Sequence, residues 1–311
     1  MTQFLIGSRA STLARTQVRE FLAPLRERFP EHTFTHRAVL EGGDRDRRSA
    51  LAQVSAVSGG SAFSTEQEAA LSRGDVDVVV HSLKDLPTSN PEGLVLLAPP
   101  AREDVRDALC GSTLAGLREG ARVGTGAPRR VAQLLAVRPD LDVIPIRGNV
   151  PPRLQKIKTM GLDAVVLAVA GLRRLGLQDE IGEVLPLDLF PPSPGQGALG
   201  IQVREDNTAV REVLSGFGDE SVDRQVRAER ALLAELHGGC SVPVGAYART
   251  LPNGELELFA QVTSLDGRER VSGTMSRRAD EPEKLGAALA YDLLGRGAGR
   301  ILDTVRGALT H

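Results

Sequence analysis

A short polar segment, His81-Ser-Leu-Lys-Asp85, directly follows the run Val78–Val80. A β-branched run of this kind is typical of a strand that is buried on both faces. In open parallel sheets, ligands bind beyond the carboxyl ends of the strands, so Lys84 and Asp85 are expected beside a ligand. Taken alone, the segment also fits a surface loop with a solvated Lys–Asp pair, because most exposed ion pairs contribute little. Other basic segments of the chain must decide between the two interpretations.

Three further turns place arginine beside small residues at the ends of predicted strands. These turns contain Arg9 with Ser11, Arg129 with Arg130, and Arg147 with Arg153. Two sheets whose strand ends face one cleft would gather five or six cations there, and such a cleft requires a polyanionic ligand. Arginine binds carboxylate and phosphate in bidentate fashion. Phosphate is less favoured because the chain has no GxxxxGK[ST] loop, so we expect a compact ligand with many carboxylates.

Asp85 is then one carboxylate among cations, and the neighbouring positive charge keeps it ionised. Such a carboxylate can face positive charge that develops on a substrate nitrogen, or transfer a proton there. Cys240 follows two glycines at a helix-to-strand turn, which leaves its thiol little steric cover. Cys110 is expected to be a small buried hydrophobe. His81 is expected to be a hydrogen-bonded loop histidine, and the histidines show no metal-ligand spacing.

Hydrophobic periodicity predicts three groups of elements. The first has strands at 4–6, 33–40, 76–80 and 94–98, with helices at 12–29 and 64–73. The second has strands at 122–124, 141–146 and 164–170, with helices ending near 137 and 160. The third has helices at 221–236 and 281–306 and strands at 244–248, 255–263 and 268–276. Residues 41–60 are expected to form a long mobile lid.

The predicted fold class is α/β, with two α/β domains and a small C-terminal α+β domain of three strands and helices. The strand at 199–203 is expected to return to the first domain, because its segment is too short to stand alone. We therefore place domain 1 at 1–98 and 197–217, domain 2 at 102–194 and domain 3 at 221–311. The strand–turn–helix pattern in domain 2 predicts a mostly parallel sheet.

The composition limits the partners that the chain can bind. Its 311 residues have a net charge of −2, and aromatic residues make up only 3% with no Trp. Nucleic-acid binding usually needs a basic surface and stacking platforms, so we do not expect it. No apolar run approaches the roughly 18 residues of a membrane span, and the two cysteines are too few for a disulfide framework or a Cys-based zinc site. We expect a soluble cytoplasmic protein that binds a small molecule and no metal.

Six segments occur together in the order that one known family shows. They are Gly7-Ser-Arg-Ala-Ser-Thr-Leu-Ala14, His81-Ser-Leu-Lys-Asp-Leu-Pro87, Val123-Gly-Thr-Gly-Ala-Pro-Arg-Arg130, Arg147-Gly-Asn149, Pro194-Gly-Gln-Gly-Ala198 and Gly238-Gly-Cys-Ser-Val-Pro243. On these segments, the chain resembles the porphobilinogen deaminase (hydroxymethylbilane synthase) family along essentially its whole length. The resemblance implies a monomer with two domains like those of periplasmic binding proteins and a third domain that holds the cofactor.

The resemblance also implies a reaction and residue roles. The family condenses four porphobilinogen molecules head to tail with loss of ammonia, and releases the linear tetrapyrrole hydroxymethylbilane for haem and other tetrapyrroles. Its dipyrromethane cofactor is attached by a thioether to the cysteine that matches Cys240, and Asp85 matches its catalytic carboxylate. The other implied contacts are to the cofactor from Ser82, Lys84, Thr125, Gly126, Arg129 and Arg130, and to the substrate from Arg9, Ser11, Arg147, Asn149 and Arg153.

Two segments depart from the family pattern and keep alternatives open. The lid pattern Lys-Val-Gly-Gly-Lys-Gly is replaced by the lysine-free segment Gln53-Val-Ser-Ala-Val-Ser-Gly-Gly-Ser61, and Ser-Ser-Leu before the Arg pair is replaced by Gly126-Ala-Pro128. One alternative is an inactive paralogue with an altered lid, although Asp85 and Cys240 are both present. The other is a soluble two-domain ligand-binding or effector-sensing protein, which would have no use for the third domain.

Overall fold

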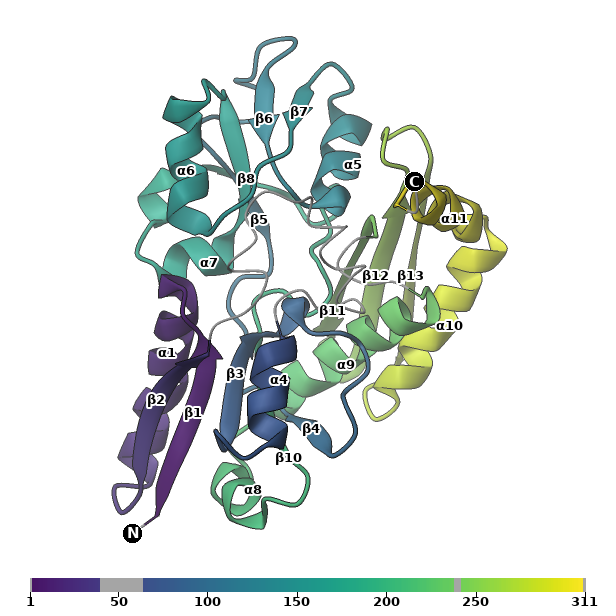
Figure 1. Ribbon diagram of the computed structural model, residues 1–311. Coiled ribbons are helices and arrows are strands. Elements are labelled where there is room, and N and C mark those ends of the chain that lie inside the picture. The colour runs from purple at the N-terminus through teal and green to yellow at the C-terminus, as the bar shows by residue number, and fades with distance from the viewer. Residues whose placement is uncertain (1, 40–63, 238–241, 310–311) are drawn as a thin grey trace.

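The chain forms three units, each built on its own β-sheet, as Figure 1 shows at the lower left, the top and the right. The computed structural model describes residues 2–39, 64–237 and 242–309. Two of the units are α/β, and the third combines three strands with helices on one side. The predicted fold class is therefore confirmed. The predicted lid at 41–60 lies outside the described residues.

The first sheet has the strand order β2-β1-β3-β10-β4. Its strands are β1 (Gln3–Arg9), β2 (Thr33–Val39), β3 (Val78–Ser82), β4 (Leu94–Leu97) and β10 (Leu199–Arg204). β1 runs parallel to β2 and to β3, whereas β10 lies antiparallel between β3 and β4. The accompanying helices are α1 (Thr12–Arg28), α4 (Thr65–Ser72) and α8 (Thr208–Leu214).

Helix α1 is held on the first sheet by an apolar stripe. Val18, Phe21, Leu22 and Leu25 recur at three- and four-residue spacing and are buried against strand residues such as Ile6. Pro24 lies on the exposed side, and the helix continues through it to Arg28. Because α1 is unbroken, the turn after β1 is fixed at one end by the sheet and at the other by a packed helix.

The second sheet has the strand order β7-β6-β8-β5-β9. Its strands are β5 (Asp107–Cys110), β6 (Arg122–Gly124), β7 (Asp142–Ile144), β8 (Ala164–Ala168) and β9 (Ile181–Val184). Its helices are α5 (Pro128–Val137), α6 (Val150–Thr159) and α7 (Val169–Arg174), followed by the 3₁₀ turn η2 (Gln178–Glu180).

The prediction of a mostly parallel second sheet is confirmed for β6, β7, β8 and β9, which run in one direction, whereas β5 runs against them. β6 is parallel to β7 and β8, but β5 is antiparallel to both β8 and β9. Parallel neighbours require a crossover connection, usually a helix. The chain enters β5 directly from the first unit, so this strand joins the sheet without such a crossover. β9, in contrast, follows β8 through α7 and η2 and lies on the other side of β5, in the same direction as β8. Neither strand was predicted from the sequence.

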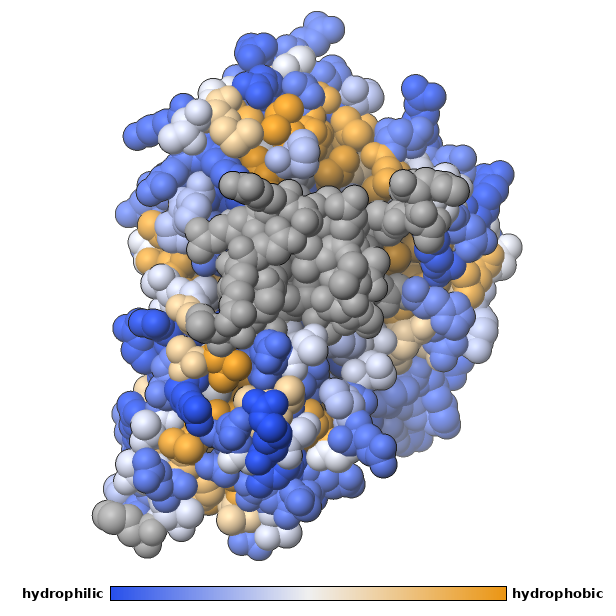
Figure 2. Space-filling view, in the orientation of Figure 1, coloured by the Kyte–Doolittle hydropathy of each residue, from blue (hydrophilic) through white to orange (hydrophobic). Residues whose placement is uncertain are grey.

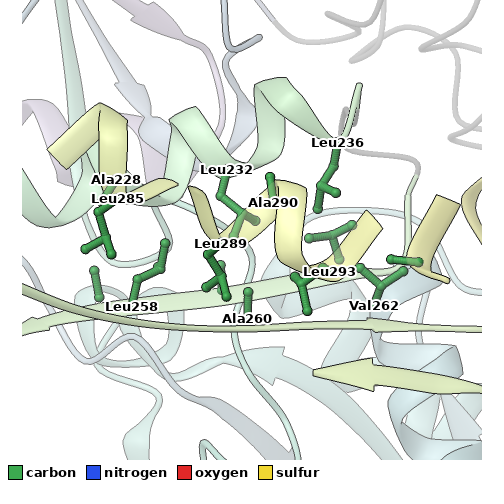
Figure 3. Packing of buried hydrophobic residues seen from close by; sticks show 14 of the residues in the cluster. Ala228, Leu232, Leu236, Leu258, Ala260, Val262, Leu285, Leu289, Ala290 and Leu293 are labelled. Atoms are coloured by element: carbon green, nitrogen blue, oxygen red, sulfur yellow. The ribbon is translucent and has the colours of Figure 1, made fainter. Parts of the chain in front are cut away.

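The third unit places three helices against a three-stranded antiparallel meander. Its elements are α9 (Glu220–Glu235), β11 (Val244–Thr250), β12 (Glu255–Thr263), β13 (Arg270–Arg278), α10 (Pro282–Gly295) and α11 (Ala298–Leu309). Figure 3 shows Leu232 of α9, Leu289 of α10 and Ala260 of β12 meeting in the buried layer between helices and strands. At Gly286, a Cβ would lie 2.4 Å from the Ala228 carbonyl oxygen, so the two helix backbones approach closely. The single helix predicted at 281–306 is wrong, because Gly297 adopts φ +101° and separates α10 from α11.

A buried ion pair joins the third unit to both segments that cross between the first two sheets. Glu229 of α9 has no exposed surface, and its carboxylate accepts from Arg102 Nη1 at 2.9 Å and Nη2 at 2.8 Å. It also accepts from the backbone N–H of Gly195 at 2.7 Å and of Ala248 in β11 at 2.8 Å. Arg102 precedes β5 and Gly195 precedes β10, so one carboxylate fixes three parts of the fold.

Hydrophilic side chains dominate the rim of the face drawn in Figure 2, and the largest apolar area on it lies over the second unit. Among the described residues, no helix combines the length and apolarity that crossing a membrane would require. Nor do those residues contain a group of three or more His, Cys, Asp or Glu side chains that could hold a metal ion.

Candidate anion-binding cleft

The segment after β3 is anchored from below by one apolar side chain. Strand β3 ends in the 3₁₀ turn η1 (Leu83–Asp85), in which Leu83 has no exposed surface while Lys84 and Asp85 are partly buried. Leu83 packs with Val222 and Val226 of α9, and its N–H donates to the Ala198 carbonyl at 3.1 Å. Burying Leu83 therefore places the two charged neighbours at the strand end, where the sequence predicted a ligand site.

Lys84 is connected to the second unit through a buried glutamine. Its Nζ donates to Gln196 Oε1 at 3.0 Å, and Gln196 Nε2 donates to Asp107 Oδ1 at 2.9 Å and to the Val105 carbonyl at 2.7 Å. Gln196 is 1% exposed and Asp107 is fully buried. The sequence analysis assigned no site role to Gln196 or to Asp107, although Gln196 lies within the family-like segment at 194–198.

Asp107 binds both members of the arginine pair. Arg129 Nη2 donates to Asp107 Oδ2 at 2.8 Å, and Arg130 Nη2 donates to Asp107 Oδ1 at 2.7 Å. Burial alone would raise the pKa of Asp107, but the two guanidiniums outweigh it and hold that pKa well below its usual value. The expectation that Asp85 is one carboxylate among cations is therefore incomplete, because Asp107 is a second one.

The two arginines differ in how far the protein satisfies them. Arg129 Nη1 also donates to Gln133 Oε1 and to the Pro191 carbonyl, both at 2.9 Å. Arg130 Nη1 donates to the Val166 carbonyl at 3.1 Å, but its Nε is buried and meets no acceptor among the described residues. Arg130 lines the cleft described next, and Arg129 is not among the residues that line it.

A cleft between the first two units collects several of these side chains. It has about 510 Å³ of empty space, counting the open solvent at its mouth. Its polar and charged lining residues come from both units and are Gln17, Ser82, Lys84, Arg130, Arg153, Arg174 and Gln196. Four of them are cations, and the described residues contribute no Asp or Glu side chain to the lining. The cleft is thus suited to an anion.

The cations of the cleft act on one another electrostatically. Burial, followed by the charge of Arg130, lowers the pKa of Lys84 to about 8, while Asp85 and Asp107 oppose that decrease. Burial and the charge of Arg130 likewise lower the pKa of Arg153 to about 10, with further lowering by Arg147 and Arg9. Residues from all four predicted strand ends therefore lie within electrostatic reach of one another, as the sequence indicated.

Other predicted residues have local structural partners. Ser11 caps α1, and its Oγ accepts from the Ala14 N–H at 3.2 Å. Thr125 is buried, and its Oγ1 accepts from the Ala127 N–H at 3.3 Å. Asn149 is exposed at the start of α6. At Gly126, a Cβ would stand 2.4 Å from the Ile146 carbonyl oxygen, so any side chain there requires the backbone to shift.

Arg174 and Gln17 line the cleft but were missed. Arg174 is 7% exposed at its side chain and donates through Nε to Glu20 at 2.7 Å and through Nη2 to the Gly197 carbonyl at 3.0 Å. It follows the buried strand β8, so the strand-end argument applied to the other arginines could have found it. Gln17 donates to Ser82 Oγ at 2.8 Å, and nothing in its sequence context marks it.

The remaining candidates have simple environments or lie outside the described residues. His81 is buried, hydrogen-bonds to Gln202 at 3.1 Å, and has its pKa lowered to about 4 by burial. The prediction of a hydrogen-bonded histidine is confirmed, although His81 belongs to β3 and not to a loop. Cys110 is fully buried, as expected, and burial raises its pKa to about 12. Cys240 is outside the described residues.

Solved structures that are similar in part include extracellular and periplasmic binding proteins. The extracellular-binding protein YtmK of a probable amino-acid ABC transporter from Bacillus subtilis has 12% identity and a TM-score of 0.43, over 69% of this chain and 89% of that chain. An arginine-specific periplasmic binding protein from Salmonella typhimurium has 13% identity and a TM-score of 0.40, over 70% of this chain and 92% of that chain.

Sequence comparison identifies one family over nearly the whole chain. Residues 4–212 match porphobilinogen deaminase, dipyrromethane cofactor binding domain, and residues 224–295 match porphobilinogen deaminase, C-terminal domain. A porphobilinogen deaminase of Geobacter sp. (strain M21) is 46% identical over 98% of this chain and 95% of its own length. One from Carboxydothermus hydrogenoformans is 42% identical over 98% of this chain and 97% of its own length. The chain therefore belongs to the porphobilinogen deaminase family.

Proposed function

We propose that the protein is a cytoplasmic, monomeric transferase that condenses four porphobilinogen molecules head to tail, with loss of ammonia, into hydroxymethylbilane. One observation supports this substrate above others: cations from both units converge on a single cleft. Each porphobilinogen ring has two carboxylates, so a chain of such rings is the polyanion that a cationic cleft attracts. No metal, nucleic acid or membrane is needed for this proposal.

The proposed domains follow the three sheets. Domain 1 would comprise 1–98 and 197–217, domain 2 would comprise 102–194, and domain 3 would comprise 221–311. The pairing of β10 with β3 and β4 supports the return of the chain to domain 1. In this division, the cleft lies between domains 1 and 2, and domain 3 packs beneath the turn that contains Asp85.

The donors of the cleft fit a cofactor with several carboxylates. Arg130 Nε and Arg153 Nε are both buried with no hydrogen-bond partner among the described residues, which is costly unless an acceptor is bound there. We assign the dipyrromethane to a thioether at Cys240, with its carboxylates held by Lys84 and Arg130. Arg129, Ser82, Thr125 and Gly126 complete the cofactor-binding set. When bound, the dipyrromethane supplies the primer to which new pyrrole rings are added.

The incoming porphobilinogen is assigned to a second group of residues in the same cleft. Arg9, Arg147 and Arg153 supply positive charge for its acetate and propionate groups, and Ser11 and Asn149 supply polar contacts at two helix starts. Arg9 and Arg147 both lower the pKa of Arg153, which supports a shared location for the three. Their mutual repulsion is relieved when a dicarboxylate binds between them.

Asp85 is proposed as the catalytic residue. Loss of ammonia breaks the C–N bond of the aminomethyl group and leaves positive charge on the pyrrole of the substrate. A carboxylate at the tip of η1 can stabilise that charge at the pyrrole nitrogen and accept a proton from it. The negative charge of Asp85 offsets part of the lowering of the pKa of both Lys84 and Arg153, so Asp85 acts within the cationic group and not outside it.

Intact mass measurement tests this function. Protein produced in a host that makes porphobilinogen should be heavier than its sequence by two pyrrole units. Cys240→Ser should remove the addition, while Cys110→Ser should keep it, because Cys110 is fully buried. The loaded protein should then consume porphobilinogen and release ammonia. An unmodified wild-type mass, or a loaded protein without turnover, would contradict the proposal.

A further inference from the structure

Asp107 is a buried carboxylate to which the proposed chemistry assigns no role. It stands at the first position of β5, where the chain enters the second unit, and has no exposed surface. Its Oδ2 accepts from Arg129, and its Oδ1 accepts from both Arg130 and Gln196, at 2.7–2.9 Å. All three partners are themselves at most 5% exposed, so water cannot replace these contacts.

The single negative charge of Asp107 neutralises only one of the two guanidinium charges of Arg129 and Arg130, so the three side chains together keep one positive charge. Arg129 uses its other nitrogen for Gln133 and Pro191, so Asp107 fixes it within the fold. Arg130 is held by Asp107 and the Val166 carbonyl through its two Nη atoms, which leaves the buried Nε without a partner among the described residues. Asp107 thus determines which edge of Arg130 remains available to an anion.

Gln196 extends this control to Lys84. A side-chain amide has a donor end and an acceptor end, and its orientation follows from what surrounds it. The Nε2 of Gln196 faces the acceptors Asp107 Oδ1 and the Val105 carbonyl, so Oε1 is directed to the Lys84 ammonium. A reversed amide would place a donor against the ammonium. The carboxylate therefore orients a cation that it does not touch.

We propose that Asp107 is a positioning residue for anion binding: it sets the exposed edge of Arg130 directly and the location of the Lys84 ammonium through Gln196. This role rests on the proposed function, because it assumes that Arg130 and Lys84 bind carboxylates. Asp107→Asn is the informative change. An asparagine must turn its NH₂ toward Arg129 or toward Arg130 and Gln196, so at least one donor then faces another donor.

Competitive amine labelling followed by peptide mass spectrometry tests the link to Lys84. The chain has only four lysines, and exposed Lys158 serves as the internal reference. Among the described residues, the charged groups that act on Lys84 include Arg129, Arg130, Asp85 and Asp107. In cofactor-free Cys240→Ser protein, we expect Asp107→Asn to lower the titration midpoint of Lys84 by about one pH unit, the size of a nearby-charge effect.

The matched control is Asp140→Asn, which removes another arginine-paired carboxylate, that of Arg138 just beyond the far end of α5. It should leave the Lys84 midpoint unchanged. In loaded protein, Asp107→Asn should raise the KM for porphobilinogen by about tenfold or more, as expected for losing charge-assisted contacts. It should also move the alkaline limit of kcat/KM to lower pH.

A folded Asp107→Asn protein with the wild-type Lys84 midpoint and wild-type KM would overturn the proposal. If that variant does not fold, Gln196→Leu replaces it, because it cuts the path to Lys84 and leaves Asp107 with both arginines. An unchanged midpoint in Gln196→Leu would equally overturn the proposal. The labelling experiment does not depend on turnover. An inactive wild-type protein would therefore refute the proposed function, but the titration midpoint of Lys84 would still test the role of Asp107.

Discussion

Two carboxylates share the cationic group at different depths. Asp107 is fully buried and committed to two guanidiniums, whereas Asp85 is partly buried at the tip of a short turn. A group that must face positive charge on a substrate cannot be fully enclosed by protein, so the difference in depth supports the proposal of Asp85 rather than Asp107 as the catalytic carboxylate. The sequence predicted the position of Asp85 just beyond β3, because that position depends on one strand end. It did not reveal Asp107, because the partners of Asp107 come from α5 and from the segment before β10.

Asp85→Asn should keep the fold and lose most of the turnover. The amide keeps the shape but cannot stabilise positive charge, and removing a positioned acid–base group typically costs about 10²–10⁴-fold in rate. Single-turnover rates and circular dichroism on loaded protein would measure both properties. Asp140→Asn is the control for losing a carboxylate in general. Turnover of Asp85→Asn near the wild-type value would remove Asp85 from the mechanism.

The lowered pKa of Lys84 should be visible as a pH dependence of stability. In the unfolded chain, Lys84 keeps its proton up to its ordinary value of 10.5, whereas in the folded cofactor-free protein it loses it above about 8. Between these values, the unfolded state binds more protons, so the free energy of unfolding should rise with pH. Below pH 8, Lys84 is protonated in both the folded and the unfolded state. The burial of its charge then lowers the free energy of unfolding by its full amount.

Denaturant unfolding of Cys240→Ser protein at pH 7.5, 9 and 10 would measure that rise. Lys84→Met in the same background should lack the Lys84 contribution to the rise of the unfolding free energy with pH. The difference between the pH dependences of the two proteins therefore gives that contribution. In loaded protein, bound carboxylates stabilise the ammonium and should flatten the slope. Identical slopes with and without Lys84 would show that its pKa is not lowered.

At the scale of elements, the sequence predicts best where one side of a helix or strand is apolar. The stripe on α1 gave its position, even though Pro24 lies within it, because that proline faces solvent. Strands β5 and β9 were missed because each has four residues and neither is followed by a helix in the strand–turn–helix pattern. The break at Gly297 was missed because apolar periodicity continues across it from α10 into α11.

Gly286→Ala should destabilise the third unit. A Cβ at this position would meet the Ala228 carbonyl oxygen at 2.4 Å and the Leu232 nitrogen at 2.7 Å, and both are backbone atoms that move only with α9. Overpacking of this kind costs about 1–3 kcal/mol. Gly295→Ala is the matched control at the end of the same helix, where nothing lies within 4 Å.

That control should be neutral or stabilising by up to about 1 kcal/mol, because alanine favours a helix more than glycine does. Thermal and urea unfolding of the two variants would give the comparison. Equal stabilities would show that α9 and α10 can separate without loss, contrary to their packing in Figure 3.

At the scale of the whole molecule, Glu229 should be the most sensitive single contact. Glu229→Gln leaves Arg102 buried at 6% side-chain exposure without its counter-charge. Removing one partner of a buried ion pair costs about 3–5 kcal/mol. The exposed pair of Arg227 with Glu283 provides the control, and Glu283→Gln should cost at most about 1 kcal/mol.

Chemical unfolding would measure the effect. A fluorescent label attached to each unit would report the unfolding of that unit, and circular dichroism would report the loss of secondary structure in the whole protein. Because Glu229 contacts both crossing segments and β11, its loss should also separate the unfolding of the third unit from that of the other two. A Glu229→Gln protein that unfolds in one wild-type transition would show that the ion pair does not couple the units.

The place of β10 in the first sheet has a consequence for how the protein is made. β10 lies between β3 and β4, yet more than one hundred residues separate it from β3, and all of β5 to β9 are synthesised in between. On the ribosome, the second sheet is therefore complete while β3 and β4 still expose unpaired edges. The unit that begins the chain must finish folding after the unit that follows it, and its open edges are where a nascent chain is most prone to aggregation.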